Sequence, residues 1–287
     1  MPAALSAATA NLRQRGFLVA RGHVIETLTH INRVIFDKTG TLTQGRFSIT
    51  DVLLLSESSR EDVMSIATAL EADSNHPIAQ AFKSGRTEIK LRAVDVKQTT
   101  AAGIEAIVGG EIYRIGTLEF VSEIIASPSH SRAQLKELVL PDQSKLWLLL
   151  ANAQGAAAWF GLEDEVRPSA QAAIAELRDL GVSVELLSGD QSGAVALLAK
   201  KLGITEFIAG AKPADKLARL NVAQLQGDKV LMVGDGINDV PVLAGADVSV
   251  AMASASDLAQ TRADTILLNN QLTLLPQAIV LAQRTHK

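Results

Sequence analysis

Short runs of aliphatic residues, each followed by a polar turn that contains glycine, recur in the first and last parts of the chain. Three of these runs are Arg33–Phe36 before Asp37, Val182–Leu187 before Ser188-Gly189-Asp190, and Val230–Val233 before Gly234-Asp235-Gly236. The pattern is typical of a parallel α/β sheet, in which functional groups gather beyond the carboxyl ends of the strands. We therefore expect three strands to bring polar residues to one edge of a sheet.

Helices are predicted between these strands. Arg167-Pro168 opens one that reaches Leu180 and stops at Gly181, because proline suits the first turn of a helix and glycine suits its end. The other two are expected at Ser192–Leu202, before Gly203, and at Leu217–Leu225.

Residues 46 to 159 follow a different pattern. A strand at Phe47–Leu55 and a helix at Arg60–Leu70 precede short strands that polar turns separate. These strands are expected at Arg92–Lys97, Gly103–Val108, Ile112–Ile115 and Leu146–Ala151. We interpret residues 46–159 as an α+β domain inserted into an α/β domain made of residues 1–45 and 160–287.

The apolar run Leu146–Leu162 is the nearest approach to a membrane span. Asn152, Gln154 and Gly155 interrupt it, whereas a spanning helix needs about 18 or more apolar residues in succession. The run predicts two strands around a turn.

Composition excludes several classes of function. The 287 residues carry 27 Lys+Arg against 31 Asp+Glu, a net charge of −4, which does not suit a protein that binds nucleic acid by neutralising phosphates. Aromatic residues make up only 3%, which argues against stacking platforms for single strands. The absence of cysteine excludes disulfides, cysteine-based metal sites and a thiol nucleophile.

The heptapeptide from Asp37 to Thr43, Asp-Lys-Thr-Gly-Thr-Leu-Thr, is the strongest chemical signal. A carboxylate at the end of a strand, beside small hydroxyl residues and backbone N–H groups, is well placed to attack phosphorus. A lone aspartate in this position would be read as a turn cap.

Three further segments offer complementary chemistry. Ser188-Gly189-Asp190 supplies a hydroxyl and two amides for a phosphoryl oxygen, although alone it could be a helix cap. Lys216 could neutralise a phosphoryl group, although alone it could be a solvated lysine. Gly234–Asp239 contains two carboxylates and a carboxamide, oxygen ligands of the type that Mg²⁺ prefers. Asp235 would bind the metal, and Asn238 or Asp239 would position the metal or the phosphate.

Together these segments resemble the phosphotransfer core of the haloacid dehalogenase superfamily, and the heptapeptide resembles the phosphorylation motif of P-type ATPases. The resemblance implies a haloacid dehalogenase-like parallel sheet, an aspartyl phosphate at Asp37, and stabilisation of charge by Thr39, Ser188 and Lys216. It also implies that ATP and Mg²⁺ are bound. The residues implied for Mg²⁺ are Asp37, Thr39, Asp235 and Asp239, with Gly189, Asp190, Gly236 and Asn238 in support. Asp164–Arg167 resembles the segment where the chain re-enters the phosphorylation domain.

Thr39 discriminates between enzyme classes of that superfamily. Its phosphatases usually carry a second aspartate two residues after the nucleophile, which protonates an alcohol leaving group. Thr39 cannot do so, and without this acid or base the acyl phosphate should persist, as a pump requires. A soluble phosphatase of the same superfamily and a non-catalytic nucleotide-binding regulator remain as alternatives.

His76-Pro77 resembles the His-Pro signature of heavy-metal P-type ATPases, in which the histidine packs on adenine. A histidine before proline at a helix start is more often a capping or core residue, but Glu71 also matches the nucleotide-binding glutamate of this subclass. Gly103 and Gly116 match its glycines beside the nucleotide. Ala101 departs from the pattern, because a glycine is expected there and the methyl group should crowd the ligand.

The resemblance implies that the chain is the cytoplasmic catalytic portion of a metal pump. Copper is favoured because His76-Pro77 and Arg21-Gly22-His23 resemble copper exporters, with zinc or cadmium as alternatives. The transmembrane and actuator domains of the pump, and the transported metal, would lie outside this chain. The amphipathic segments Pro2–Leu18 and Leu272–Arg284 are either ends near a membrane or surface helices packed on the sheet. A P-loop ATPase is excluded, because the chain contains no Gly-Lys dipeptide.

Overall fold

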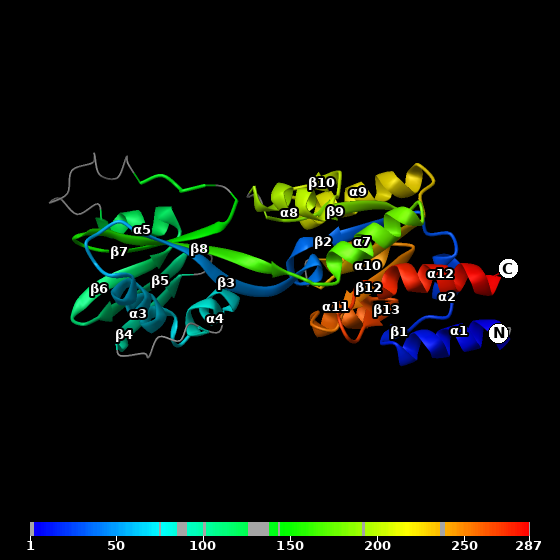
Figure 1. The fold of residues 1–287 in the computed structure, drawn as a ribbon, viewed down its shortest axis with the longest axis horizontal. Helices are drawn as coiled ribbons and strands as arrows, with labels where there is room; N and C mark the ends of the chain where they lie inside the picture. The colour runs from blue at the N-terminus through cyan, green and yellow to red at the C-terminus, as the bar shows by residue number, and fades with distance from the viewer. Residues whose placement is uncertain are drawn as a thin grey trace. The chain divides into compact units, whose positions relative to one another are not determined.

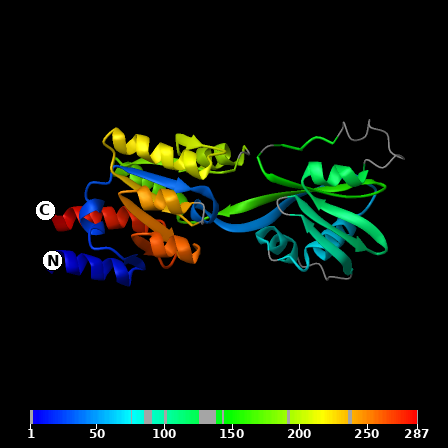
Figure 2. The same cartoon turned by 180° about the vertical axis from the view of Figure 1, so that it is seen from behind.

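The protein divides into two compact units. In the computed structural model, which describes residues 3–74, 76–84, 91–99, 102–125, 138–142, 144–190, 193–235 and 239–286, the first unit is Met1–Gly45 with Val166–Lys287 and the second is Arg46–Glu165. Figures 1 and 2 show the ribbon from opposite sides. The second boundary falls after residue 165, whereas the sequence predicts it after residue 159. Strand β8 (Gly155–Val166) runs unbroken through residue 159.

The first unit is built on a seven-stranded sheet in the order β1-β13-β12-β11-β2-β9-β10. All neighbouring strands are parallel except β1, which is antiparallel to β13. The strands are β1 (Phe17–Val19), β2 (Arg33–Asp37), β9 (Ser183–Leu187), β10 (Glu206–Ile208), β11 (Val230–Gly234), β12 (Val248–Met252) and β13 (Thr265–Leu267). The predicted parallel sheet is confirmed, and β11, β2 and β9 are adjacent, so their carboxyl ends meet at one edge.

Helices lie on both faces of this sheet (Figures 1 and 2). They are α1 (Ala3–Gln14), α2 (Val24–Leu28), α7 (Ala170–Asp179), α8 (Ala194–Leu202), α9 (Pro213–Leu225), α10 (Val240–Gly245), α11 (Asp257–Arg262) and α12 (Leu274–His286). Helix α9 starts at Pro213, four residues before the predicted start. The carboxylate of Asp215 accepts a hydrogen bond from the backbone N–H of Lys212, which satisfies an N–H that the first turn leaves free.

Helices α1 and α12 lie side by side and pack on the core of the first unit (Figure 1). Leu12 of α1 and Leu275 and Ile279 of α12 are fully or almost fully buried. The packing is that of surface helices, one of the two alternatives that the sequence left open. Among the described residues, no helix combines the length and the apolar character needed to cross a membrane.

The second unit contains a six-stranded sheet in the order β3-β8-β7-β6-β5-β4, and the part of it that the structure describes also includes helices α3, α4 and α5. Its other elements are β3 (Thr43–Leu54), α3 (Arg60–Glu71), α4 (Pro77–Lys83), β4 (Ala93–Thr99), β5 (Gly103–Val108), β6 (Glu111–Gly116), α5 (Leu118–Ile125) and β7 (Leu146–Asn152). Strands β7 and β8 pair antiparallel around Asn152 and Gly155, as the interrupted apolar run predicts.

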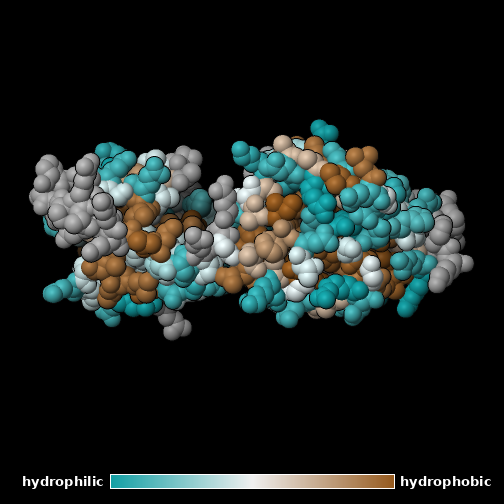
Figure 3. Space-filling view, turned by 90° about the horizontal axis from the view of Figure 1, so that it is seen from above, coloured by the Kyte–Doolittle hydropathy of each residue, from teal (hydrophilic) through white to brown (hydrophobic). Residues whose placement is uncertain are grey.

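The two faces of this sheet belong to separate hydrophobic cores. Leu148 and Leu150 of β7 join the core under α3 and α4, whereas Trp147, Leu149 and Ala151 join the core under α5. Because successive side chains of a strand point to opposite faces, burial on both sides explains why the run is continuously apolar. Figure 3 shows that hydrophobic side chains nevertheless also reach the surface, in patches between hydrophilic ones.

Candidate active site

The heptapeptide forms a tight turn at the carboxyl end of β2. Asp37 is the last residue of that strand, and residues 38–42 turn back toward β3, with Gly40 at a φ of +72°. A Cβ atom at Gly40 would lie 1.5 Å from Oδ2 of Asp235. Only glycine therefore fits here, both for its conformation and for the close approach of the Asp235 carboxylate.

Arg167 holds this turn through three hydrogen bonds. Its Nε donates to the carbonyl oxygen of Thr41 at 2.8 Å, and its Nη2 donates to that of Gly40 at 2.6 Å. Its backbone N–H donates to the carbonyl oxygen of Leu42 at 2.9 Å. Arg167 directly follows β8, where the chain returns to the first unit. The sequence marked this segment as a re-entry point but did not predict its contacts with the turn.

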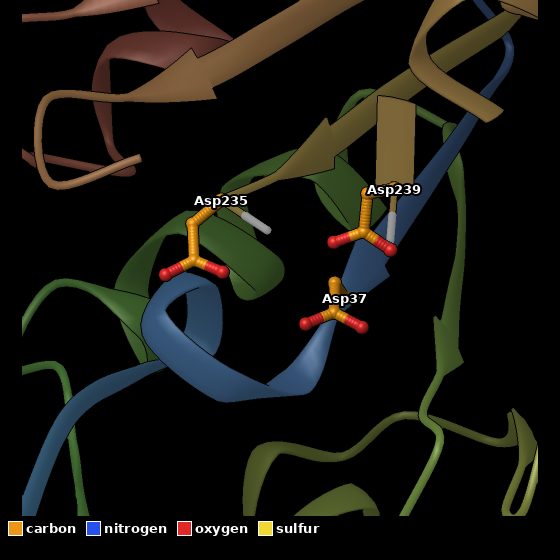
Figure 4. Close-up of side chains that lie close together, drawn as sticks. All are labelled: Asp37, Asp235 and Asp239. Atoms are coloured by element: carbon orange, nitrogen blue, oxygen red, sulfur yellow. The ribbon is translucent and has the colours of Figure 1, made fainter. Parts of the chain in front are cut away.

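Three carboxylates converge at this edge of the sheet. Asp37 comes from β2, Asp235 follows β11, and Asp239 immediately precedes α10. Ligand oxygens of all three lie within 4.8 Å of one another, and Figure 4 shows the side chains facing a common space. Two further predicted residues of this turn, Gly236 and Asn238, lie outside the described residues.

Lys216 links two of these carboxylates. From the first turns of α9 its Nζ donates to Oδ1 of Asp37 at 2.5 Å and to Oδ1 of Asp239 at 2.8 Å. All three residues are at least nine-tenths buried. The lysine is therefore bound in the site and is not a solvated surface residue.

Burial and charge set the ionisation of this cluster. Burial raises the pKa of Asp37 to about 6, repulsion from Asp239 adds to the rise, and Lys216 opposes both. Burial alone would lower the pKa of Lys216, but attraction to Asp37 and Asp239 outweighs it and raises that pKa. The lysine therefore stays charged, and its ammonium is bonded to two of the three carboxylates.

This set of donors fits a small divalent cation. The converging ligand atoms of Asp37, Asp235 and Asp239 are all oxygens, and these three carboxylates neighbour one ammonium, that of Lys216. Hard cations such as Mg²⁺ bind through one or two carboxylates together with water and phosphate oxygens. Such a cation would neutralise the excess negative charge of this cluster.

Ser188 and Asp190 lie beside this cluster, because β9 pairs with β2 and Leu187 is opposite Asp37. Oγ of the buried Ser188 accepts a hydrogen bond from the backbone N–H of Asp190 at 3.2 Å. The Asp190 carboxylate forms an ion pair with Lys38, a partner that the sequence did not predict. Gly189 and Thr39 are exposed.

In the second unit, Glu71 is the last residue of α3 and His76 directly precedes α4. Nδ1 of the exposed His76 accepts from the backbone N–H of Ile78 at 3.3 Å and so caps α4. Ser74 connects the pair, since it hydrogen bonds to Glu71 and its Oγ accepts from the backbone N–H of His76 at 3.2 Å. Lys83 donates to the Ser74 carbonyl at 2.7 Å. The sequence did not assign roles to Ser74 and Lys83.

Gly103 and Gly116 are direct partners in the pairing of β5 with β6. A Cβ at Gly103 would lie 2.2 Å from the carbonyl oxygen of Ile115, and one at Gly116 would lie 2.1 Å from that of Ala102. Each glycine permits the close approach of the other strand. Ala101, where the sequence departs from the family pattern, lies outside the described residues.

Glu71 should make the stability of the protein depend on pH. Burial raises its pKa from 4.5 to about 7, against the attraction of Lys83 and a hydrogen bond from Ser74. The folded protein therefore holds this proton more tightly than the unfolded chain, and stability present below pH 4.5 is lost as the pH rises toward 7. Glu71→Gln should raise the free energy of unfolding by roughly 2–3 kcal/mol at about pH 8 but change it little at about pH 4.

Urea titrations of both proteins at the two pH values measure this difference. Glu61→Gln, at an exposed position of the same helix, is the matched control and should show no such pH-dependent gain. An equal effect of Glu71→Gln at both pH values would contradict the assignment.

Comparison with known proteins agrees with this geometry. Residues 31–247 match the family of haloacid dehalogenase-like hydrolases. The chain is 36% identical over 277 residues to a probable copper-transporting ATPase of Synechococcus elongatus, covering 94% of this chain and 34% of that protein. It is 33% identical to a cadmium-transporting ATPase of Staphylococcus aureus, covering 99% and 40%. The chain thus spans about a third to two fifths of the length of these relatives.

Solved structures agree as well. A zinc-transporting PIB-type ATPase superposes with a TM-score of 0.82 at 34% identity, covering 99% of this chain and 46% of that one. The catalytic domain of the CPx-ATPase CopB-B superposes with a TM-score of 0.77 at 28% identity, covering 94% and 98%. The chain belongs to the haloacid dehalogenase-like hydrolase family, and within it to the catalytic domains of heavy-metal P-type ATPases.

Proposed function

We propose that this chain accepts the γ-phosphoryl group of ATP on Asp37 and so forms the catalytic portion of a heavy-metal pump. The observation that carries the proposal is the convergence of Asp37, Asp235 and Asp239, two of which, Asp37 and Asp239, are bonded to the ammonium of Lys216. A carboxylate nucleophile beside a fixed cation and a cluster of metal-binding oxygens has the parts that phosphoryl transfer needs.

In the proposed reaction, a carboxylate oxygen of Asp37 attacks the γ-phosphorus of ATP. The bond from this phosphorus to the bridging oxygen breaks, and ADP leaves with the electron pair. Lys216 and the Ser188 hydroxyl would stabilise charge on the transferring group, together with Thr39 and the backbone N–H groups near Gly189. Mg²⁺ held by Asp37, Asp235 and Asp239, with Thr39, would neutralise phosphate charge. Asp190 would act through its ion pair with Lys38, which fixes the turn.

Thr39 separates a pump from a phosphatase. Its side chain cannot serve as an acid or base, so the acyl phosphate should be hydrolysed slowly. A soluble phosphatase of the same superfamily is the alternative, and it would turn over p-nitrophenyl phosphate at an ordinary rate, on the order of 1–10³ per second. We expect this chain to hydrolyse it at least about a hundredfold more slowly than that range.

The second unit is proposed to bind the nucleotide through Glu71, His76, Gly103 and Gly116. The imidazole of His76 is exposed and offers a flat face to adenine, while the two glycines leave the ends of β5 and β6 free of side chains. Ser74 and Lys83 surround Glu71 and would set its orientation.

His76→Ala should weaken ATP binding about tenfold, because stacking on a base contributes roughly 1–3 kcal/mol. The cap that His76 makes on α4 complicates this variant, so His76→Asn is the matched control: asparagine keeps the cap and removes the ring. Calorimetric titration with ATP should show the same loss in both variants. Unchanged affinity in His76→Asn would show that the imidazole does not hold the nucleotide.

Copper is the proposed cargo of the complete protein, with zinc or cadmium as the alternative. Relatives named for copper and for cadmium are about equally similar to this chain, so the proposal rests on the residues around His76-Pro77 and Arg21-Gly22-His23. The transported metal would bind in a transmembrane domain, and an actuator domain would act on the phosphorylated site. This catalytic portion would then work at the cytoplasmic side of a membrane.

A further inference from the structure

A buried carboxylate, Glu185, lies in the strand that precedes Ser188 and takes no part in the proposed chemistry. It is in β9 and is only 2% exposed. Its Oε1 accepts a hydrogen bond from Nε of Arg219 at 2.6 Å, and its Oε2 accepts one from Nη1 of Arg33 at 3.2 Å. Both carboxylate oxygens of Glu185 are thus engaged by arginines.

Each member of this trio belongs to an element that carries a site residue or directly precedes one. Arg33 and Asp37 are the first and last residues of β2, Glu185 is in β9, which Ser188 directly follows, and Arg219 is one turn after Lys216 in α9. Glu185 pairs with Ile35 across the sheet, so by the alternation of strands its side chain shares the face of Asp37. The trio therefore ties together the three elements on the face that α9 covers.

The contacts of Glu185 with the two arginines are directional hydrogen bonds as well as ion pairs. Guanidinium groups present donors in a rigid plane, so a carboxylate held by two of them fixes their relative positions. The outer partners are Glu206, which accepts from both arginines at 2.8 and 3.2 Å, and Asp228, which accepts from Arg33 at 2.7 Å. Glu206 has a side chain that is 46% exposed, so solvent screens its interactions. Of these two carboxylates that contact both arginines, Glu185 is the buried one.

Lys216 needs accurate placement, since its ammonium contacts Asp37 and Asp239 at once. A small rotation or shift of α9 would break one of these contacts. We propose that Glu185 is a positioning residue for phosphoryl transfer, because it clamps α9 to β2 through Arg219 and Arg33 and so holds Lys216 between the two carboxylates. The inference rests on the proposed function for its catalytic meaning, but the clamp can be tested without it.

Beryllium fluoride with Mg²⁺ is a suitable probe of the assembled site, because it binds aspartate as a mimic of a phosphoryl group. Glu185→Gln should weaken its binding to the 287-residue chain about tenfold in calorimetry, equivalent to about 1.4 kcal/mol. Arg219→Gln should act in the same direction, and it keeps Glu185 paired with Arg33, so it tests the clamp if Glu185→Gln fails to fold. Glu206→Gln is the matched control and should change binding by less than about twofold.

The position of Lys216 can be measured directly by acetylation of lysines followed by mass spectrometry. In the wild-type chain Lys216 is buried and bonded to two carboxylates, so it should react slowly. Glu185→Gln and Arg219→Gln should increase its rate about tenfold, on the same scale as the change in affinity. Lys38, paired with Asp190 at the same edge of the sheet, should keep its rate, whereas general loosening of the fold would increase both.

The two readouts separate the inference from the proposed function. Failure of the wild-type chain to bind beryllium fluoride would count against phosphoryl chemistry, while the acetylation rates would still decide whether the clamp places Lys216. If both variants fold and leave both the affinity and the Lys216 rate unchanged, the clamp is wrong. A parallel rise at Lys216 and Lys38 would also overturn it.

Discussion

Asp37→Asn should abolish the acid-stable label that radioactive ATP leaves on the wild-type chain. The neutral amide of asparagine is a much weaker nucleophile toward phosphorus than a carboxylate. Losing a covalent nucleophile typically costs on the order of 10⁴-fold or more in rate. Removal of the label by hydroxylamine would identify an acyl phosphate in the wild type. Binding of ATP should be unchanged, because the residues proposed for the nucleotide lie in the other unit.

Asp179→Asn is the control for this experiment, since Asp179 is an exposed aspartate at the end of α7 in the same unit. It should label like the wild type. A wild-type chain that takes up no hydroxylamine-sensitive label, or an Asp37→Asn chain that labels normally, would contradict the proposed function.

Lys216→Met should slow label formation by on the order of 10³-fold, as expected when a cation that stabilises a phosphoryl transition state is removed. Methionine keeps an unbranched side chain of similar length but leaves Asp37 and Asp239 facing each other without the ammonium between them. Rapid-quench measurements of labelling at saturating ATP and Mg²⁺ report this loss.

The same substitution should also change stability. Breaking a buried ion pair by removing one partner costs about 3–5 kcal/mol, and Mg²⁺ should restore part of it by replacing the lost positive charge. The thermal midpoint of Lys216→Met should therefore depend more strongly on Mg²⁺ than that of the wild type. Lys212→Met, at an exposed position one turn earlier, is the matched control. Normal labelling by Lys216→Met would show that the lysine is structural only.

Much of the first unit could be predicted from the sequence because its signals are local. The strands before Asp37, Ser188 and Gly234 are short apolar runs that end in polar turns, and each lies within one residue of its predicted position. Their side-by-side order follows from the general behaviour of parallel sheets. Predicting that Asp37, Lys216 and Asp239 converge then required only the motifs and their order along the chain.

Contacts between distant residues could not be predicted in the same way. The hold of Arg167 on the Gly40 turn, the ion pair of Lys38 with Asp190 and the clamp at Glu185 each join a charged side chain to a residue more than 30 positions away. A charged residue in a sequence does not reveal its partner. The boundary near residue 165 was missed for a related reason, since β8 continues past the end of its apolar stretch.

His76, in the second unit, was predicted only in part. The sequence presents His76 either as an adenine contact or as a helix cap, and the structure shows the cap. The ring remains exposed, so the cap does not conflict with the proposed contact, and the comparison of His76→Ala with His76→Asn separates the two roles. Glu71, in contrast, could be identified by its spacing, but its burial beside Ser74 and Lys83 required the fold.

The double attachment of Lys216 has a consequence for the catalytic cycle. Its ammonium is bonded to Asp239 as well as to Asp37, so consumption of one aspartate oxygen in an anhydride bond would leave the other anchor intact. The positive charge would thus stay in place before, during and after phosphorylation of Asp37. A single side chain could then serve successive stages without leaving and returning.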